Sequence, residues 1–236
     1  GEVFTPLRKQ LQTLLDELMG SETSPSNAFN EIALPIEEQK AFVRAIATQI
    51  GFDFEAGRLD ESTHPFCSGT HCRDVRLTTR FHENNVNDAI GSTMHEAGHG
   101  IYEQGLLYEH VGTQMGQAVS LGIHESQSRM WENQVGRSEA FWKWCYPKMS
   151  EFFGDATSSL SFDDVYGGAN IVRPDFIRVE ADEATYNMHV MIRFELERLI
   201  MKGDLAVADI PDAWNQRYHE YLGIEVPSDT KGCLQD

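Results

Sequence analysis

The spacing of apolar residues along the chain predicts a mainly helical protein. Between residues 6 and 20, leucines recur at helical intervals and Gly20 ends the segment. In residues 35–52 a proline stands at a helix start, acidic residues follow it, and an apolar stripe continues to Ile50. The same periodicity predicts further helices over 84–104, 114–134, 138–153, 181–202 and 208–222.

One segment departs from this period. Residues 52–83 have no helical repeat, and within them "RDVRLTTRF" places Val75, Leu77, Thr79 and Phe81 on one face of a short strand or hairpin arm. No internal repeat, low-complexity tract or linker divides the sequence. We therefore expect one domain over residues 1–236, mainly α with a small β-sheet.

Composition and charge narrow the classes of partner. The chain is 41% hydrophobic and 24% charged, as in a globular protein. Its 37 acidic and 19 basic residues give a net charge of -18, a field that argues against nucleic-acid and membrane partners. The four cysteines show no disulfide-framework spacing, which favours a reducing, cytoplasmic location.

The segment "HEAGH" carries the first candidate chemistry. His95 and His99 are four residues apart, so on a helix both imidazoles can reach one metal ion. Glu96 lies about 100° around the helix, where it can act as general base toward water. Gly98 and Gly100 each cost about 1 kcal/mol in a helix, which indicates close packing or function. A solvent-facing polar helix is the alternative.

A third ligand decides between these interpretations. Glu125 follows His99 by 26 residues (125 − 99), enough for a turn and a second helix packed against the first. A zinc site with two histidines and one glutamate needs such a carboxylate. His124, beside it, is a candidate to support a ligand or bind substrate.

Five motifs in one order then carry a family resemblance. They are "HPF" at 64–66, "DVRLT" at 74–78, "HEAGH" at 95–99, "HESQSR" at 124–129 and "IRVEAD" at 177–182. With these motifs the chain resembles the thermostable (Taq-type) metallocarboxypeptidases, cytoplasmic enzymes that use zinc or cobalt. The resemblance implies a zincin-like helical metallopeptidase core with a small β-sheet near the active site.

The last family motif, Gly-x-x-Gln-Asp-x-His-Trp, is matched only by Gly232, Gln235 and Asp236, where the sequence given ends. Members of the family are also about twice as long. We therefore expect a catalytic-core fragment that keeps its metal ligands, binds metal, turns over poorly and self-associates more than a full-length protein. The resemblance implies a homodimer for that full-length protein.

A carboxypeptidase must hold the terminal carboxylate of its peptide, and a guanidinium can do so with two parallel hydrogen bonds. We expect Arg178 to fill this role, with an ion pair to Asp182 as the alternative. Arg76 is expected to shape the site together with Asp74.

Three other residues are candidates for substrate binding. The resemblance places His64 of "HPF" near the substrate. Tyr186 and His189, on a helix after Arg178, could donate to the oxyanion of a tetrahedral intermediate. A packed helix with a polar face is the alternative for both.

These patterns predict a metal-dependent carboxypeptidase that releases C-terminal residues from peptides, with metal-activated water and Glu96 as base. The alternatives are a zinc endopeptidase or aminopeptidase with the same core, and an inactive metal- or peptide-binding fragment. A separate structural zinc site is a further alternative for the residues of "HPFCSGTHC", namely His64, Cys67, His71 and Cys72; its spacing is not that of a standard finger.

Overall fold

The computed structural model of the protein describes residues 2–235; Gly1 and Asp236, the latter in the final motif named above, lie outside the described residues. The described chain divides into two compact units. Residues 25–169 form a sheet-containing unit, called here the sheet unit. Residues 2–24 and 170–235 form the helical unit. The expected single domain over 1–236 stays a prediction.

The sheet unit contains several α-helices, and three of them match ranges predicted from the apolar periodicity. The helices are α2 (Ala28–Glu31), α3 (Ile36–Ile50), α4 (Val86–Gln104), α5 (Leu121–Arg129), α6 (Glu139–Phe153) and α7 (Phe162–Ala169). The expected helices over 35–52, 84–104 and 138–153 are confirmed as α3, α4 and α6. Pro35 occupies the N-cap of α3, and Gly51 ends that helix with a φ of 112° that favours glycine.

The expected helix over 114–134 is only partly correct. The Ser120 side chain accepts a hydrogen bond from the Ile123 amide and starts α5 at Leu121. Short 3-10 turns precede it at Tyr108–His110 and Gln114–Gly116. After Arg129 the winding widens into a π-helical segment, Met130–Val135.

Three strands form one sheet within residues 2–235. They are β1 (Gly57–Glu61), β2 (Phe66–His71) and β3 (Asp74–Thr79), in the order β1-β3-β2. β1 runs parallel to the central strand β3 and β2 antiparallel to it. Val75 and Leu77 of β3 are fully buried, which confirms the face predicted for that strand.

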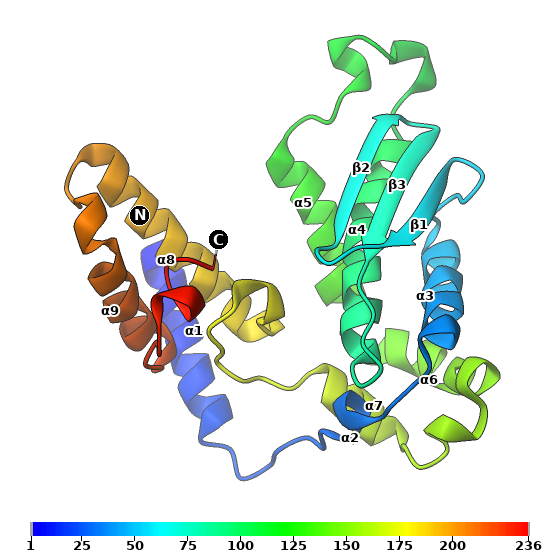
Figure 1. Ribbon diagram of the computed structural model, residues 1–236, viewed down its shortest axis with the longest axis horizontal. Coiled ribbons are helices and arrows are strands. Elements are labelled where there is room, and N and C mark those ends of the chain that lie inside the picture. The colour runs from blue at the N-terminus through cyan, green and yellow to red at the C-terminus, as the bar shows by residue number, and fades with distance from the viewer. Residues whose placement is uncertain (1, 236) are drawn as a thin grey trace. The chain divides into compact units, whose positions relative to one another are not determined.

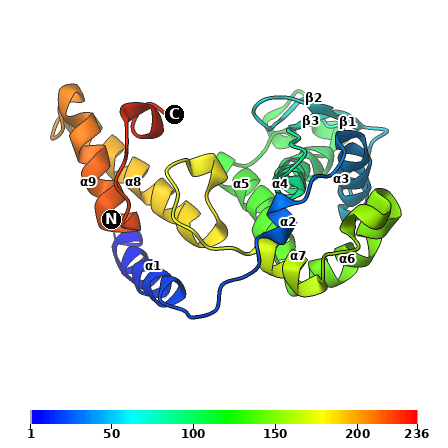
Figure 2. The same ribbon diagram turned by 60° about the horizontal axis from the view of Figure 1, so that its bottom comes forward.

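Helix α4 is the centre of the sheet unit. It lies between α5 and α3, and one of its faces packs against β2 and β3 (Figures 1 and 2). Val75 and Leu77 meet Ala97 of α4 in a small cluster beneath the sheet. A larger core that includes Met94 and Trp142 joins α3, α4, α6 and α7. The helix that carries "HEAGH" is therefore held on several sides.

The helical unit packs α1 (Phe4–Met19), α8 (Glu183–Lys202) and α9 (Ile210–Leu222) around one apolar cluster. These elements confirm the helices expected over 6–20, 181–202 and 208–222. Asp182 caps α8 by accepting from the amides of Ala184 and Thr185. Together with the sheet unit, this confirms a mainly helical fold with a small sheet.

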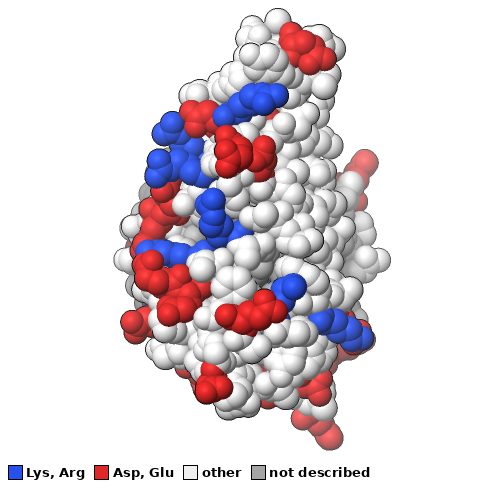
Figure 3. All heavy atoms as spheres, turned by 90° about the vertical axis from the view of Figure 1, so that its right-hand side faces the viewer, with Lys and Arg blue, Asp and Glu red and all other residues white. Residues whose placement is uncertain are grey.

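No helix within residues 2–235 combines the length and apolar character needed to cross a bilayer. On the face drawn in Figure 3, basic side chains lie interspersed among acidic ones. On that face, the net charge of -18 is therefore not gathered into a patch of one sign.

Candidate metal centre

Two glycines allow the helices of the site to approach closely. A Cβ atom at Gly98 would lie 2.8 Å from the Gln127 carbonyl oxygen of α5. A Cβ atom at Gly100 would lie 2.6 Å from the Phe52 ring, on another side of α4. Side chains at these positions would push the neighbours away, which confirms the close packing expected from the glycines of "HEAGHG".

His95, His99 and Glu125 come together at the crossing of α4 and α5. The Oε2 atom of Glu125 lies 3.6 Å from Nε2 of His95 and 3.2 Å from Nε2 of His99. One ligand atom from each residue lies within 4.8 Å of the other two. Donors of a tetrahedral zinc with bonds of about 2.0–2.1 Å would stand about 3.3–3.4 Å apart. The three side chains therefore fit one small divalent cation.

Glu96 is positioned beside this cluster by the same helix. Its side chain is buried, with 7% of the residue exposed. Burial raises the pKa of the Glu96 carboxyl, and the nearby Glu125 carboxylate acts in the same direction, while His95 and His99 oppose the rise. A carboxyl that gains from taking up a proton suits a general base toward water.

The charges of the Glu125 and His95 side chains shift each other's pKa values. Burial disfavours the ionised form of Glu125, but the hydrogen bond from His99 and the charge of His95 outweigh it and lower the pKa to about 2. Burial likewise opposes the charged form of His95, yet Glu132, Glu125 and Glu96 outweigh it and raise the His95 pKa. The carboxylate is thus ready to serve as an anionic ligand.

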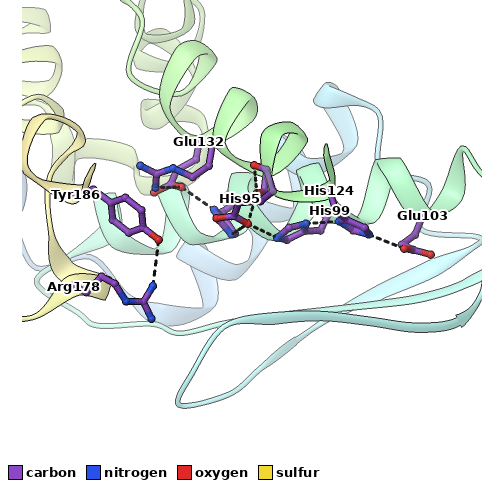
Figure 4. Close-up of polar contacts among 10 residues, drawn as sticks. His95, His99, Glu103, His124, Glu132, Arg178 and Tyr186 are labelled. Carbon is purple, nitrogen blue, oxygen red and sulfur yellow. Dashed lines mark hydrogen bonds and ion pairs between the residues drawn. The ribbon is translucent and has the colours of Figure 1, made fainter. Parts of the chain in front are cut away.

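Glu132 contacts the ring nitrogen of His95 that does not face Glu125. Its Oε2 atom lies 2.8 Å from Nδ1 of His95 and 2.8 Å from an Nη atom of Arg129 (Figure 4). Nδ1 of His95 therefore donates to Glu132, which leaves Nε2 toward Glu125. Hydrogen bonding to His95 and the charge of Arg129 overcome the effect of burial and lower the Glu132 pKa.

His124 and Glu103 extend the site along α4. The Nδ1 atoms of His99 and His124 lie 2.6 Å apart, and Nε2 of His124 lies 2.6 Å from Oε1 of Glu103 (Figure 4). All three side chains are at least partly buried. His124 thus contacts the candidate ligand His99, and its expected contact with substrate stays a prediction.

The sequence contained signals for the two residues that were missed. Glu103 follows His99 by four residues, as His99 follows His95, so all three share one face of α4. Glu132 follows Glu125 by seven residues, about two helical turns. Periodicity thus indicates both carboxylates once the histidine pair is accepted as a ligand pair.

The candidates His64 and Arg76 occupy different environments in the sheet unit, and the roles expected for both stay predictions. His64 is exposed before β2 and lies close enough to Glu96 for a positive charge on it to lower the Glu96 pKa. Arg76 occupies the face of β3 opposite Leu77, where it makes two hydrogen bonds of 3.0 Å to Asp74. The Arg76–Asp74 pair is thus an exposed ion pair on the sheet face that α4 does not cover.

The remaining substrate-binding candidates belong to the helical unit. An Nη atom of Arg178 donates to the Tyr186 hydroxyl over 3.2 Å (Figure 4). His189 is fully buried in that unit, with Nδ1 lying 3.0 Å from the Tyr218 hydroxyl. The roles expected for Arg178, Tyr186 and His189 stay predictions.

Gln235, from the last motif, supports the segment that carries Arg178. Its Oε1 atom accepts from the Arg178 amide over 3.0 Å, and its Nε2 atom donates to the Phe176 carbonyl over 2.9 Å. Arg193 donates to the same Oε1 atom over 2.9 Å. Two motifs that are far apart in the sequence thus meet through this side chain.

Comparisons with known proteins agree with this geometry. A model of the carboxypeptidase Taq (M32) metallopeptidase family matches residues 1–236. The chain is 45% identical over 235 residues to thermostable carboxypeptidase 1 of Thermus thermophilus, covering 99% of this chain and 46% of that protein. It is 41% identical to carboxypeptidase 1 of Bacillus subtilis, covering 100% of this chain and 47% of that protein.

Solved structures give the same result. The crystal structure of the M32 carboxypeptidase from Deinococcus radiodurans matches with a TM-score of 0.96 and 44% identity. That match covers 100% of this chain and 47% of the other. The chain spans about half the length of the curated relatives it matches.

Proposed function

Because this chain belongs to the carboxypeptidase Taq (M32) metallopeptidase family, we propose that it carries the metal centre of a metal-dependent carboxypeptidase releasing C-terminal amino acids from peptides. The observation that carries the proposal is the meeting of His95, His99 and Glu125 beside the buried Glu96. These are the residue types of a two-histidine, one-glutamate catalytic site with a base.

In this proposal His95 and His99 each present Nε2, and Glu125 presents one carboxylate oxygen, to a single divalent ion. Three protein ligands leave one position for water or substrate, as catalytic zinc sites do. We propose zinc as the metal, with cobalt as the alternative. The bound ion supplies a Lewis acid that polarises the scissile carbonyl and makes water more acidic.

Glu96 performs the proton transfers. Its carboxylate takes a proton from the attacking water and later returns it to the leaving amine. Burial favours the protonated intermediate state of this carboxyl, because it raises the Glu96 pKa. The same side chain thus serves as base and then as acid.

Recognition of the free carboxylate is assigned to Arg178. Its guanidinium can offer two parallel hydrogen bonds to a carboxylate. Tyr186, whose hydroxyl lies 3.2 Å from an Arg178 Nη atom, would donate to the oxyanion. Peptide substrates, a homodimer of the full-length protein and a cytoplasmic location complete the proposal. The free state of Cys67, Cys72, Cys145 and Cys233 supports that location.

The test uses the whole protein to which this chain belongs. Free-acid peptides should lose single C-terminal residues, a chelator should stop the reaction, and added zinc should restore it. Peptides with an amidated C-terminus should be poor substrates. Undiminished hydrolysis in chelator would contradict a metal mechanism, and equal cleavage of amidated peptides would point to an endopeptidase or aminopeptidase.

A further inference from the structure

The backbone that leads to Arg178 has no regular secondary structure of its own. Residues 171–177 form neither helix nor strand, and the 3-10 turn Arg178–Glu180 follows them. Ile177 is extended, with a φ of -95° and a ψ of 119°. In an extended chain, the carbonyl of one residue and the amide of the second residue after it point to the same side. The Phe176 carbonyl and the Arg178 amide therefore stand side by side and need partners from elsewhere.

The Gln235 side chain pairs with both of these groups. Its Nε2 atom donates to the Phe176 carbonyl over 2.9 Å, and its Oε1 atom accepts from the Arg178 amide over 3.0 Å. One primary amide thus contacts the extended backbone as a neighbouring strand would. The side chain of Gln235 therefore fixes the place from which the Arg178 side chain starts.

Arg193 determines which end of the Gln235 amide faces Arg178. An Nη atom of Arg193 donates to Oε1 of Gln235 over 2.9 Å. A guanidinium and a backbone N–H can only donate, so a reversed amide would set its NH₂ group against two donors. Cζ of Arg193, on α8, lies 4.7 Å from the ring centroid of Trp214, on α9. The Gln235 amide thus has one orientation and connects the backbone at Arg178 to both helices.

The side chain of Arg178 is held by a different residue. An Nη atom of Arg178 donates to the Tyr186 hydroxyl over 3.2 Å (Figure 4). Two parallel hydrogen bonds to a carboxylate require that a guanidinium lie within about 10–20° of its productive direction. A contact at the Arg178 backbone and a contact at its side chain together restrict that direction.

We propose that Gln235 is a positioning residue for recognition of the terminal carboxylate of the substrate, which acts by holding the backbone of Arg178. The inference rests on the proposed function, since it assumes that Arg178 binds that carboxylate. The amide of Gln235 is used by the protein backbone and Arg193, so its effect on the substrate passes through Arg178. Loss of Gln235 should therefore impair hydrolysis of free-acid peptides much more than hydrolysis of amidated ones.

The first experiment is a double-mutant cycle of Gln235→Met and Arg178→Ala in the whole, zinc-loaded protein. Methionine keeps the length of the side chain but cannot donate a hydrogen bond and accepts only weakly. We expect Gln235→Met to lower kcat/KM for a free-acid peptide by about 10-fold when Arg178 is present and by less than about two-fold when it is alanine. Equal losses in both backgrounds would overturn the inference, because a general structural defect acts whether or not Arg178 is present.

The matched control for this cycle is Gln216→Met. Gln216 is an exposed residue of α9, and its side chain contacts only Glu220 among the printed hydrogen bonds of the described residues. We expect kcat/KM to change by less than about two-fold in this variant, in either background.

The second experiment needs no variant that could fail to fold. Hydrogen exchange of the Arg178 amide is followed by NMR in the whole wild-type protein. An amide that donates to Gln235 should exchange at least about 10-fold more slowly than the same amide in an unstructured peptide. Exchange at the rate of the unstructured peptide would overturn the inference.

The outcomes separate this inference from the proposed function. If Arg178→Ala abolishes the preference for free-acid over amidated peptides while Gln235→Met leaves it intact, the role of Gln235 is wrong and that of Arg178 stands. If Arg178→Ala keeps the preference of the wild type, the role assigned to Arg178 is wrong, and the inference about Gln235 with it.

Discussion

Gly98 of α4 and Ser128 of α5 approach so closely that a Cβ atom at position 98 would lie 2.7 Å from Cα of Ser128. The atoms nearest to this Cβ position, Cα of Ser128 and the carbonyl group of Gln127, belong to the backbone and cannot rotate away. The contact therefore sets the separation of the helix that carries His95 and His99 from the helix that carries Glu125.

Replacing Gly98 by Ala should push these helices apart. We expect a loss of about 1–3 kcal/mol in the free energy of unfolding, as for an overpacked core, and weaker zinc binding. Gly91→Ala, in the same helix with no atom within 4 Å of a Cβ, is the matched control. It should stabilise by up to about 1 kcal/mol. Denaturant unfolding measures the stability of each variant, and zinc titration measures its affinity for the metal. Equal stability and affinity in the two variants would contradict the close contact at Gly98.

Glu96→Gln should keep the metal and lose hydrolysis. The amide is nearly isosteric but cannot take a proton from water, so turnover of a free-acid peptide should fall by about 100-fold or more. Metal content and turnover are measured on the same preparation of the full-length protein. Turnover close to that of the wild type would eliminate Glu96 as the base.

As the pH falls, the affinity for zinc should begin to decrease at a higher pH than it would with a histidine of ordinary pKa. The pKa of His95 is raised above the usual value of 6.5, so its imidazole takes up a proton at a higher pH. Zinc must displace that proton to bind. Affinity is therefore present at high pH and lost as the pH falls through the raised pKa. Calorimetry in buffers of different ionisation enthalpy measures the protons released.

The control for this titration is Glu132→Gln, which removes the main group that raises the His95 pKa. Proton release at about pH 7 should decrease in this variant. Release that is unchanged from the wild type would show that the Glu132 contact does not set the protonation of His95.

Arg178→Lys should impair hydrolysis of free-acid peptides although the charge is kept. A lysine cannot make the two parallel hydrogen bonds, so kcat/KM should fall by on the order of 10-fold. The penalty should shrink for amidated peptides, which have no terminal carboxylate. An equal penalty of Arg178→Lys on both kinds of peptide would indicate a structural role for Arg178.

The local parts of the site were predictable from the sequence, whereas the supporting contacts were not. The pairing of His95 with His99 depends only on helix geometry, and Glu125 follows at a spacing that permits a crossing helix. The contact of His124 with Glu103 depends on how α4 and α5 cross, which is a tertiary property. Helical spacing still indicated the face on which Glu103 lies.

The errors in the fold have similar causes. Met115 and Val119 lie in the part of the expected helix over 114–134 that did not form, and they are 73% and 74% exposed with no core to hold a helix. β1 was missed because Gly57–Glu61 has little apolar character and forms its ladder only with the distant β3. Periodicity identified elements that bury an apolar face and failed where pairing or capping decides.

If His95, His99 and Glu125 bind one divalent ion, zinc K-edge X-ray absorption should detect their nitrogen and oxygen atoms around the metal. The zinc-loaded protein should contain about one zinc, with only nitrogen and oxygen neighbours at about 2.0–2.2 Å and the signature of two imidazoles. His99→Ala should remove one imidazole from the spectrum. Sulfur at about 2.3 Å, as the alternative site with Cys67 and Cys72 would give, or an unchanged spectrum in His99→Ala, would contradict the account.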